Sequence, residues 1–242
     1  PWSTRAAIGR HAVMQLRDAV IVVTGGAQGI GGAAARLCAE RGGQVVIADW
    51  NAANGAKVAA LLHELGYTAS FVQTDVRSPE AVQNLMGEVQ AQYGRLDVLV
   101  CAAGIFKGAF QPPDELTVED FDAVIDVNLK GVFLCTKYAM PLLDARGGGG
   151  TIIIVGSPAG VTGASGSLAY GASKGGVKML TRNLSVELGP LGITINNIAP
   201  GAIETPINTK LLNDPVKLNA LLGQIPLKRL GQPGEWPTTH FA

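Results

Sequence analysis

A tyrosine and a lysine lie four residues apart in the stretch LAYGASKGG, residues 168 to 176. If this stretch is helical, Tyr170 and Lys174 lie on one face of the helix, about one turn apart. An ordinary contact on a helix surface would account for the pair. A chemical explanation also exists, because an ammonium beside a phenol in a site shielded from water favours the phenolate. Moving a phenol pKa from about 10 to about 7 requires roughly 4 kcal/mol of preferential stabilisation of the phenolate.

A second group of candidate residues lies in the glycine-rich segment VVTGGAQGIGGAAARL, which follows the first aliphatic run. Glycines let the backbone approach a pyrophosphate closely, and the start of the following helix offers free N–H groups. Gly29, Gly31 and Ala34 fit the looser dinucleotide-binding spacing that allows alanine last. A glycine-rich turn alone is equally consistent with a plain loop.

Asp49 strengthens the interpretation of the glycine-rich segment as a nucleotide site. It ends the second aliphatic run, eighteen residues beyond Gly31, where an acid can accept hydrogen bonds from an adenosine ribose. An ordinary turn aspartate at the end of a strand is the alternative. A carboxylate at the ribose would repel a 2′-phosphate, and Trp50 rather than a cation follows Asp49. The sequence therefore predicts NAD as the cofactor in preference to NADP.

The elements that must position these residues follow a repeating pattern. Short aliphatic runs predict buried strands at 19–24, 44–49, 68–75, 96–102, 151–157 and 193–200. Helical spacing predicts helices at 29–41, 53–65, 79–93, 117–144 and 167–189. Strands that alternate with helices form βαβ units, so we expect an α/β fold, a doubly wound parallel sheet with helices on both faces.

The domain organisation is expected to be simple. No linker-like stretch divides the chain, which predicts a single domain over residues 14–242. Residues 1–13 precede Met14 and are expected to be a tag remnant or a loose extension. Four glycines at 147–150 predict a turn between the long helix and the fifth strand.

Composition excludes several classes of function. Of the 242 residues, 47% are hydrophobic and 16% charged, which is typical of a compact globular protein. Nineteen basic residues balance nineteen acidic ones, which argues against a nucleic-acid partner, and no apolar run has the length of a membrane span. Three widely spaced cysteines predict reduced thiols in a cytoplasmic protein. The scattered histidines indicate neither a metal site nor a Ser-His-Asp triad.

Seven motifs, taken together and in order, resemble the short-chain dehydrogenases/reductases, in the single-domain branch with TGxxxGxG and YxxxK motifs. The resemblance covers roughly residues 17 to 235, and the position of Ser157 thirteen residues before Tyr170 is a specific part of it. It implies a Rossmann-type fold and a nicotinamide-dependent enzyme that interconverts a secondary alcohol and a ketone by hydride transfer. The motifs are TGGAQGIG at 24–31, Asp75-Val76, AAG at 102–104, Asn128 in DVNLKGVF, Ser157, YGASK at 170–174 and PGAIET at 200–205.

The resemblance also assigns catalytic roles to four residues. Tyr170 would be the general base for alcohol oxidation and the general acid for ketone reduction, while Lys174 would lower the phenol pKa and hold the nicotinamide ribose. Ser157 would hydrogen-bond the substrate oxygen. Asn128 would anchor a water that links Lys174 to solvent. A turn at the end of a strand for Ser157 and a satisfied core amide for Asn128 are the structural alternatives.

Cofactor contacts are expected along the ends of the strands. Asp75 and Val76 would contact the adenine, although TDV before Ser-Pro is also an ordinary strand exit. Thr205 would contact the nicotinamide carboxamide or the phosphates, or would simply cap a helix ahead of Pro206. The full predicted set is Gly25, Gln28, Gly29, Ile30, Gly31, Asp49, Trp50, Asp75, Val76, Ala102, Ala103, Gly104, Tyr170, Lys174, Pro200, Gly201, Ile203 and Thr205.

Two departures from the family pattern stand out. Cys101 occupies the position before AAG where the family usually has asparagine, which removes an amide that helps to fix this loop. After RLGQPGEW the family continues through another helix and a last edge strand, whereas this chain reads PTTHFA, so that strand is expected to be missing. With a complete C-terminus the resemblance implies a homo-oligomer, a dimer or a tetramer.

Two alternative functions stay open. The stretch NNIAPGAIETPIN, residues 196–208, resembles bacterial glucose 1-dehydrogenases and suggests a sugar substrate. Against a sugar, Ile105 and Ala159 place apolar groups near the expected pocket, where a sugar would need hydrogen bonds. The second alternative is a catalytically impaired nicotinamide-binding protein, which the altered C-terminus would permit.

Overall fold

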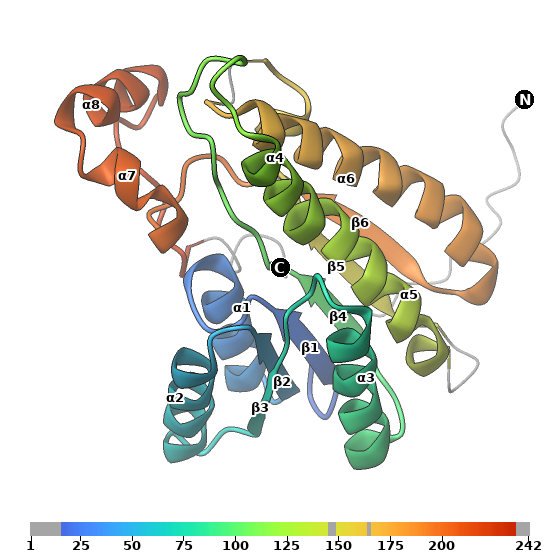
Figure 1. The fold of residues 1–242 in the computed structure, drawn as a ribbon. Helices are drawn as coiled ribbons and strands as arrows, with labels where there is room; N and C mark the ends of the chain where they lie inside the picture. Colours follow the sequence, from blue (N-terminus) through green and yellow to red (C-terminus); the bar gives the residue numbers. More distant parts are fainter. Residues whose placement is uncertain (1–15, 145–148, 164–165, 236–242) are drawn as a thin grey trace, which may run out of the picture.

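The computed structural model describes residues 16–144, 149–163 and 166–235. The expectations for residues 1–13 and for the segment from 236 onward fall outside these residues. Six strands form one sheet in which every neighbouring pair is parallel, in the order β3-β2-β1-β4-β5-β6 (Figure 1). The expected parallel sheet is therefore confirmed. The strands are β1 (Val20–Thr24), β2 (Gln44–Asp49), β3 (Ala69–Gln73), β4 (Val98–Cys101), β5 (Thr151–Val155) and β6 (Thr194–Ile198).

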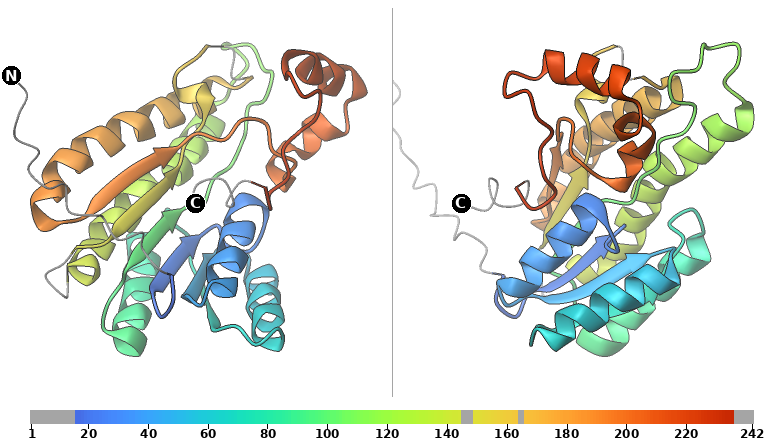
Figure 2. Two further views of the ribbon diagram at one scale, coloured as in Figure 1. Left: turned by 180° about the vertical axis from the view of Figure 1, so that it is seen from behind. Right: turned by 90° about the vertical axis from the view of Figure 1, so that its left-hand side faces the viewer.

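Helices cover both faces of this sheet (Figure 2). Along β1, Val20 and Val22 belong to the core beneath one set of helices, while Ile21 and Val23 belong to the core beneath the other. This alternation follows from the two-residue period of a strand and explains why the strands are aliphatic throughout. One layer holds α3 (Pro79–Tyr93), α5 (Gly131–Leu143) and α6 (Leu168–Leu188), and the other holds α1 (Gly29–Glu40) and α2 (Ala52–Glu64).

The long helix expected at 117–144 is interrupted. It divides into α4 (Val118–Ile125), a π-helical turn η1 (Asp126–Lys130) and α5. Asn128 lies in the middle of this turn and is completely buried. A π turn inserts an extra residue into the helical ladder and is frequent at functional sites. Helical periodicity alone did not reveal this interruption, because the segment remains helical on both sides.

Two short helices near the C-terminus were missed at the sequence level. They are α7 (Thr209–Leu212) and α8 (Pro215–Gln224), and they form a lobe beyond the carboxyl ends of the strands (Figure 1). Asp214 caps α8 by accepting a hydrogen bond from the Lys217 backbone N–H at 3.1 Å, and Pro215 occupies the first helical position. An aspartate followed by proline is a recognisable helix start. This signal could have located α8.

Candidate active site

The glycine-rich turn between β1 and α1 is folded tightly against the loop that follows β4. Gly25 and Gly29 have φ values of +66° and +55°, in the left-handed region that favours glycine. A Cβ on Gly25 would lie 2.7 Å from the Cα of Ala103, and a Cβ on Gly31 would overlap the carbonyl oxygen of Gly25. Gln28 is the N-cap residue of α1, and its side chain makes no capping hydrogen bond among the described residues. The first backbone N–H groups of α1 are therefore not capped by this side chain. This side-chain-free cradle fits the pyrophosphate of a dinucleotide.

Asp49 ties the end of β2 to the glycine-rich turn. One carboxylate oxygen accepts a hydrogen bond from the Ala27 backbone N–H at 3.1 Å, and the other accepts one from the Asn51 backbone N–H at 3.0 Å. The side chain is buried, while the neighbouring Trp50 is 70% exposed. A carboxylate can accept about four hydrogen bonds, so these two leave acceptor capacity for ribose hydroxyls.

Thr24 is a structural residue of the site that the sequence reasoning missed. Its hydroxyl oxygen accepts hydrogen bonds from the backbone N–H groups of Ala102 and Ala103, at 3.2 and 3.3 Å. The loop after β4 is thus fixed although Cys101 replaces the family asparagine. The Cys101 thiol is itself buried. Its pKa is raised mainly by a hydrogen bond with Cys135 and, to a smaller extent, by burial. A buried threonine that ends an aliphatic run directly before two glycines is the signal that could have identified this anchor.

Asn128 connects the π turn to two other parts of the site. Its side-chain oxygen accepts from the Ile105 backbone N–H at 2.9 Å, and its side-chain nitrogen donates to the Ile105 carbonyl at 3.0 Å. The same nitrogen donates to the Ser173 hydroxyl at 3.2 Å. Asn128 therefore holds the loop after β4 against α6 at the residue before Lys174.

The structure brings Ser157, Tyr170 and Lys174 together at the carboxyl end of β5. The Ser157 side chain hydrogen-bonds the Tyr170 side chain and also accepts from the Ala159 backbone N–H at 3.1 Å. The Lys174 ammonium donates to the Val155 carbonyl at 2.7 Å and lies 5.6 Å from the centroid of the Tyr170 ring. The arrangement places a hydroxyl, a phenol and an ammonium at one point of the sheet edge.

Burial acts on the pKa values of both Tyr170 and Lys174 in the protein without its cofactor. In the protein alone, burial raises the pKa of the Tyr170 phenol, and the hydrogen bond with Ser157 only partly opposes this effect. Lys174 is buried as well, and burial lowers the pKa of its ammonium to about 8. The physical reason is desolvation, which disfavours the charged form of each group. A lowering of the phenol pKa by Lys174 together with a bound nicotinamide stays a prediction.

The remaining predicted cofactor residues lie around the same edge. The Asp75 carboxylate is engaged by the Arg77 guanidinium, with the closest contact at 2.6 Å, which lowers the Asp75 pKa. Val76 is buried, and its side chain packs so closely on α5 that a Cβ on Gly131 would lie 2.7 Å from it. Thr205 lies beside the glycine turn, where a Cβ on Gly29 would be 3.4 Å from its methyl group.

The segment that carries Thr205 is held in place by contacts of Ile203. Ile203 forms a parallel bridge with Gly231, and its carbonyl accepts from the Asn208 side chain at 2.7 Å. Thr205 precedes the 3₁₀ turn η4 (Pro206–Asn208), where its hydroxyl lies 3.5 Å from the Ile203 carbonyl instead of capping the turn. Pro200 and Gly201 lead into this segment after Ala199, the first residue beyond β6. Thr205 is thus oriented by its own loop and placed next to Gly29.

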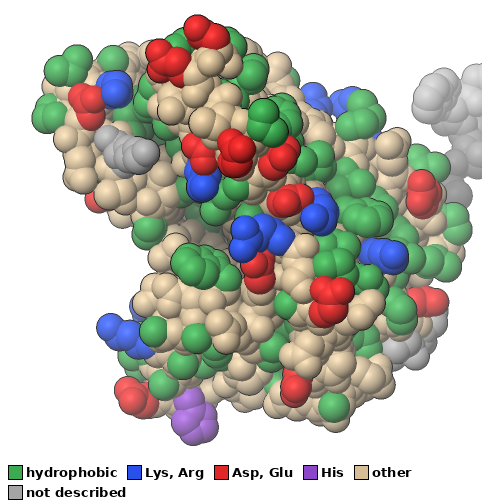
Figure 3. All heavy atoms as spheres, viewed as in Figure 1, with side chains coloured by type: hydrophobic (Ala, Val, Ile, Leu, Met, Phe, Trp, Pro, Cys, Tyr) green, Lys and Arg blue, Asp and Glu red, His purple; other side chains and the backbone are tan. Residues whose placement is uncertain are grey.

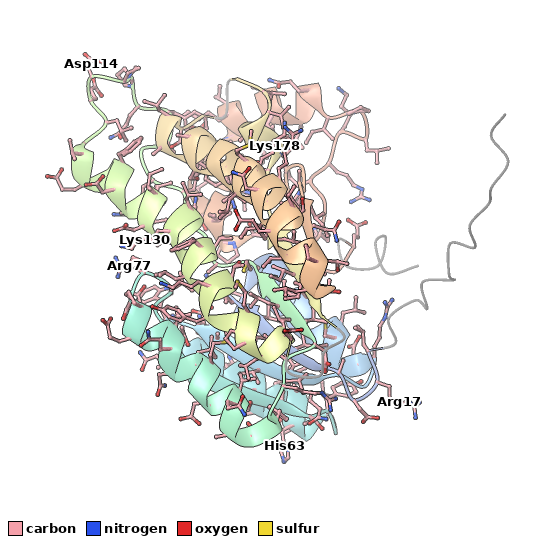
Figure 4. The ribbon with its side chains drawn as sticks, turned by 90° about the vertical axis from the view of Figure 1, so that its right-hand side faces the viewer. Arg17, His63, Arg77, Asp114, Lys130 and Lys178 are labelled. Carbon is pink, nitrogen blue, oxygen red and sulfur yellow. The ribbon has the colours of Figure 1, made fainter. Side chains whose placement is uncertain are left out.

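The surface is hollowed between the lobe of α7 and α8 and the part of the body that carries α1 (Figure 3). Asp126 forms an ion pair with Lys130 at 3.0 Å and attracts Arg77. The Lys130 and Arg77 side chains lie near each other in Figure 4. Within the described ranges, no cluster of His, Cys, Asp or Glu has the makings of a metal site. None of the described helices has the length and apolar character that a membrane crossing requires.

Comparison with known proteins agrees with this geometry. A family model described as short chain dehydrogenase matches residues 19–215. The chain is 42% identical over 220 residues to a cis-4-hydroxycyclohexanecarboxylate dehydrogenase of Sinomonas cyclohexanicum, covering 90% of this chain and 86% of the relative. It is 35% identical over 222 residues to a cyclopentanol dehydrogenase of a Comamonas species, covering 91% and 87%.

A solved structure extends the likeness to three dimensions. The crystal structure of gox2181 superposes with a TM-score of 0.89 at 34% identity, covering 94% of this chain and 89% of that chain. The family match and the structural likeness both extend over most of the chain. The chain therefore belongs to the short-chain dehydrogenases/reductases, a family of oxidoreductases that use nicotinamide cofactors.

Proposed function

We propose that this protein is an NAD-dependent dehydrogenase that interconverts a cyclic secondary alcohol and the corresponding ketone, with Tyr170 as general acid and base. The observation that carries the proposal is the convergence of Ser157, Tyr170 and Lys174 at the carboxyl end of β5. The glycine-rich turn follows the carboxyl end of β1 in the same parallel sheet. The cyclic substrate class is supported by the two relatives whose names specify hydroxylated carbocycles.

Residues of this chain fit the cofactor along the sheet edge. The turn from Gly25 to Gly31 would hold the pyrophosphate, and Asp49 would accept hydrogen bonds from the adenosine ribose. The preference for NAD rests on Asp49, because a buried carboxylate at the ribose would repel a 2′-phosphate. When bound, the oxidised cofactor supplies a hydride acceptor at its nicotinamide ring and a positive charge beside the phenol.

The protein residues would handle the substrate oxygen and its proton. Ser157 would donate a hydrogen bond to the oxygen, and the Tyr170 phenolate would accept its proton during alcohol oxidation. Burial raises the pKa of Tyr170 in the protein alone, so the phenolate requires further positive charge in the loaded site. We propose that the oxidised nicotinamide supplies this further charge beside that of Lys174. Oxidation should consequently accelerate as pH rises through the pKa of Tyr170.

The test is absorbance of the reduced nicotinamide with cyclohexanol, cyclopentanol, 2-propanol and glucose, each with NAD and with NADP. We expect turnover of the cyclic alcohols with NAD, and a loss of at least about 10²-fold in kcat in Tyr170→Phe. Energy transfer from the exposed Trp50 to NADH measures cofactor binding separately, and Tyr170→Phe should leave it nearly unchanged. A Tyr170→Phe variant with full activity would refute the assigned role. Turnover of glucose alone would favour the sugar alternative, and NADH binding without any turnover would favour the impaired alternative.

A further inference from the structure

Phe106 contacts the proposed catalytic tyrosine directly. The rings of Phe106 and Tyr170 pack edge to face, with centroids 5.0 Å apart and planes at 85°. We propose that Phe106 is a specificity-determining residue, which favours substrates with an apolar ring at the carbinol carbon over short acyclic alcohols and polyols. The inference rests on the proposed function in one respect, that the reacting oxygen binds at Tyr170.

The backbone before Phe106 is fixed from the π turn. Both polar backbone groups of Ile105 are held by the Asn128 side chain, at 2.9 and 3.0 Å. Asn128 is completely buried and also bonds α6 through Ser173. Phe106 therefore follows a residue whose position is set relative to the helix that carries Tyr170.

The backbone after Phe106 is fixed to the start of the same helix. The Ser167 hydroxyl donates to the Lys107 carbonyl at 2.8 Å and accepts from the Tyr170 backbone N–H at 3.3 Å. Ser167 is the N-cap of α6 and is buried. The three residues 105–107 are thus attached to α6 on both sides of Phe106, so its ring has little freedom to move away from Tyr170.

The chemistry of this wall discriminates between substrate classes. Phe106 is only partly buried, so part of its surface remains accessible next to the residue that it contacts, Tyr170. An apolar ring gains contact area and favourable ring geometry there, whereas a polyol would lose hydrogen bonds to water without replacement. Ile105 and Ala159, on the two segments that flank Tyr170, carry no side-chain hydrogen-bonding groups either. Selection for apolar rings follows from the fixed position of Phe106.

The deciding measurement is the affinity of two ketones for the full chain saturated with NAD⁺, in which no hydride can be transferred to the ketone. Saturation-transfer NMR titrations with cyclohexanone and propanone give the ring preference as the ratio of their Kd values. We expect Phe106→Ala to lower this preference by roughly tenfold, the lower range for loss of apolar contact in a pocket. Phe106→Leu keeps apolar bulk in case the alanine variant does not fold, and should retain part of the preference.

Phe133→Ala is the matched control, because Phe133 lies on α5 with 46% of its surface exposed. It should leave the ring preference unchanged. Any of three results would overturn the inference. These are an unchanged ring preference in both Phe106 variants, an equal loss of the preference in Phe133→Ala, and a wild type that shows no preference for the ring. The same proteins assayed for oxidation of cyclohexanol and 2-propanol separate the two proposals. If ring binding depends on Phe106 but no alcohol is oxidised, the proposed function alone is refuted. If the alcohols are oxidised but the ring preference does not depend on Phe106, this inference alone is refuted.

Discussion

Replacing Lys174 by methionine tests whether burial of the ammonium lowers the free energy of unfolding. Burial lowers the pKa of Lys174 from 10.5 to about 8, and at about 1.4 kcal/mol per pH unit this difference corresponds to about 3 kcal/mol. The charged side chain is therefore destabilising at pH 7 by an amount of that order. Methionine has a similar length and no charge, so Lys174→Met should unfold at a higher urea concentration than the wild type at pH 7.

The pH dependence gives the sign of the effect. Below pH 8 both the folded and the unfolded state hold the proton, so the full penalty acts on the wild type. Between pH 8 and 10.5 the folded state loses the proton while the unfolded state retains it, and stability rises with pH wherever the unfolded state binds more protons. The wild type should therefore gain stability relative to Lys174→Met across this window.

The assay is urea unfolding of both proteins at pH 7, 8, 9 and 10, followed by circular dichroism. The difference in the free energy of unfolding should be constant below pH 8 and should shrink by about 2 kcal/mol by pH 10. Loss of the hydrogen bond to the Val155 carbonyl shifts this difference by about 1 kcal/mol at every pH, so the slope is the diagnostic quantity. A difference that stays the same from pH 7 to pH 10 would refute the reasoning.

Three further predictions concern the cofactor cradle and its supports. Asn128→Ala leaves both backbone groups of Ile105 without their partner, so the free energy of unfolding should fall by about 1–3 kcal/mol for each unpaired group; a urea titration that shows no loss would contradict this. Asp49→Ser should weaken NADH binding and shift the preference toward NADPH, and equal affinities of the wild type for both cofactors would show that Asp49 does not meet the ribose. Gly31→Ala introduces a Cβ that overlaps the Gly25 carbonyl, so NADH binding measured by energy transfer should be lost. If the Gly31→Ala variant binds NADH as tightly as the wild type, the turn relaxes to accommodate the methyl group.

Much of the fold could be predicted because its causes are local. The strands are buried on both faces, so each is a short aliphatic run, and the predicted and observed strands differ by no more than two residues at either end. The helices α7 and α8 could not be located in the same way, because α8 buries no residue completely and shows little apolar periodicity. The π turn at Asn128 was also missed, because a single inserted residue hardly disturbs a helical pattern.

The candidate site also has features that the sequence predicts and features that depend on tertiary packing. The sequence by itself determined which groups are present and their order: the glycine-rich turn, Asp49, Ser157 and the pair Tyr170 and Lys174. Spacing along one helix sets the distance within that pair, so this part needed no tertiary information.

Only the tertiary structure decided the environment of these groups. The pKa of Tyr170 is raised and that of Lys174 lowered because burial depends on every element packed around them. Likewise, the contact of Phe106 with Tyr170 joins residues 64 positions apart through a loop that Asn128 and Ser167 fix to α6. Desolvation and long-range contacts are properties of the packed chain, and for that reason no local pattern of residue types could have predicted them.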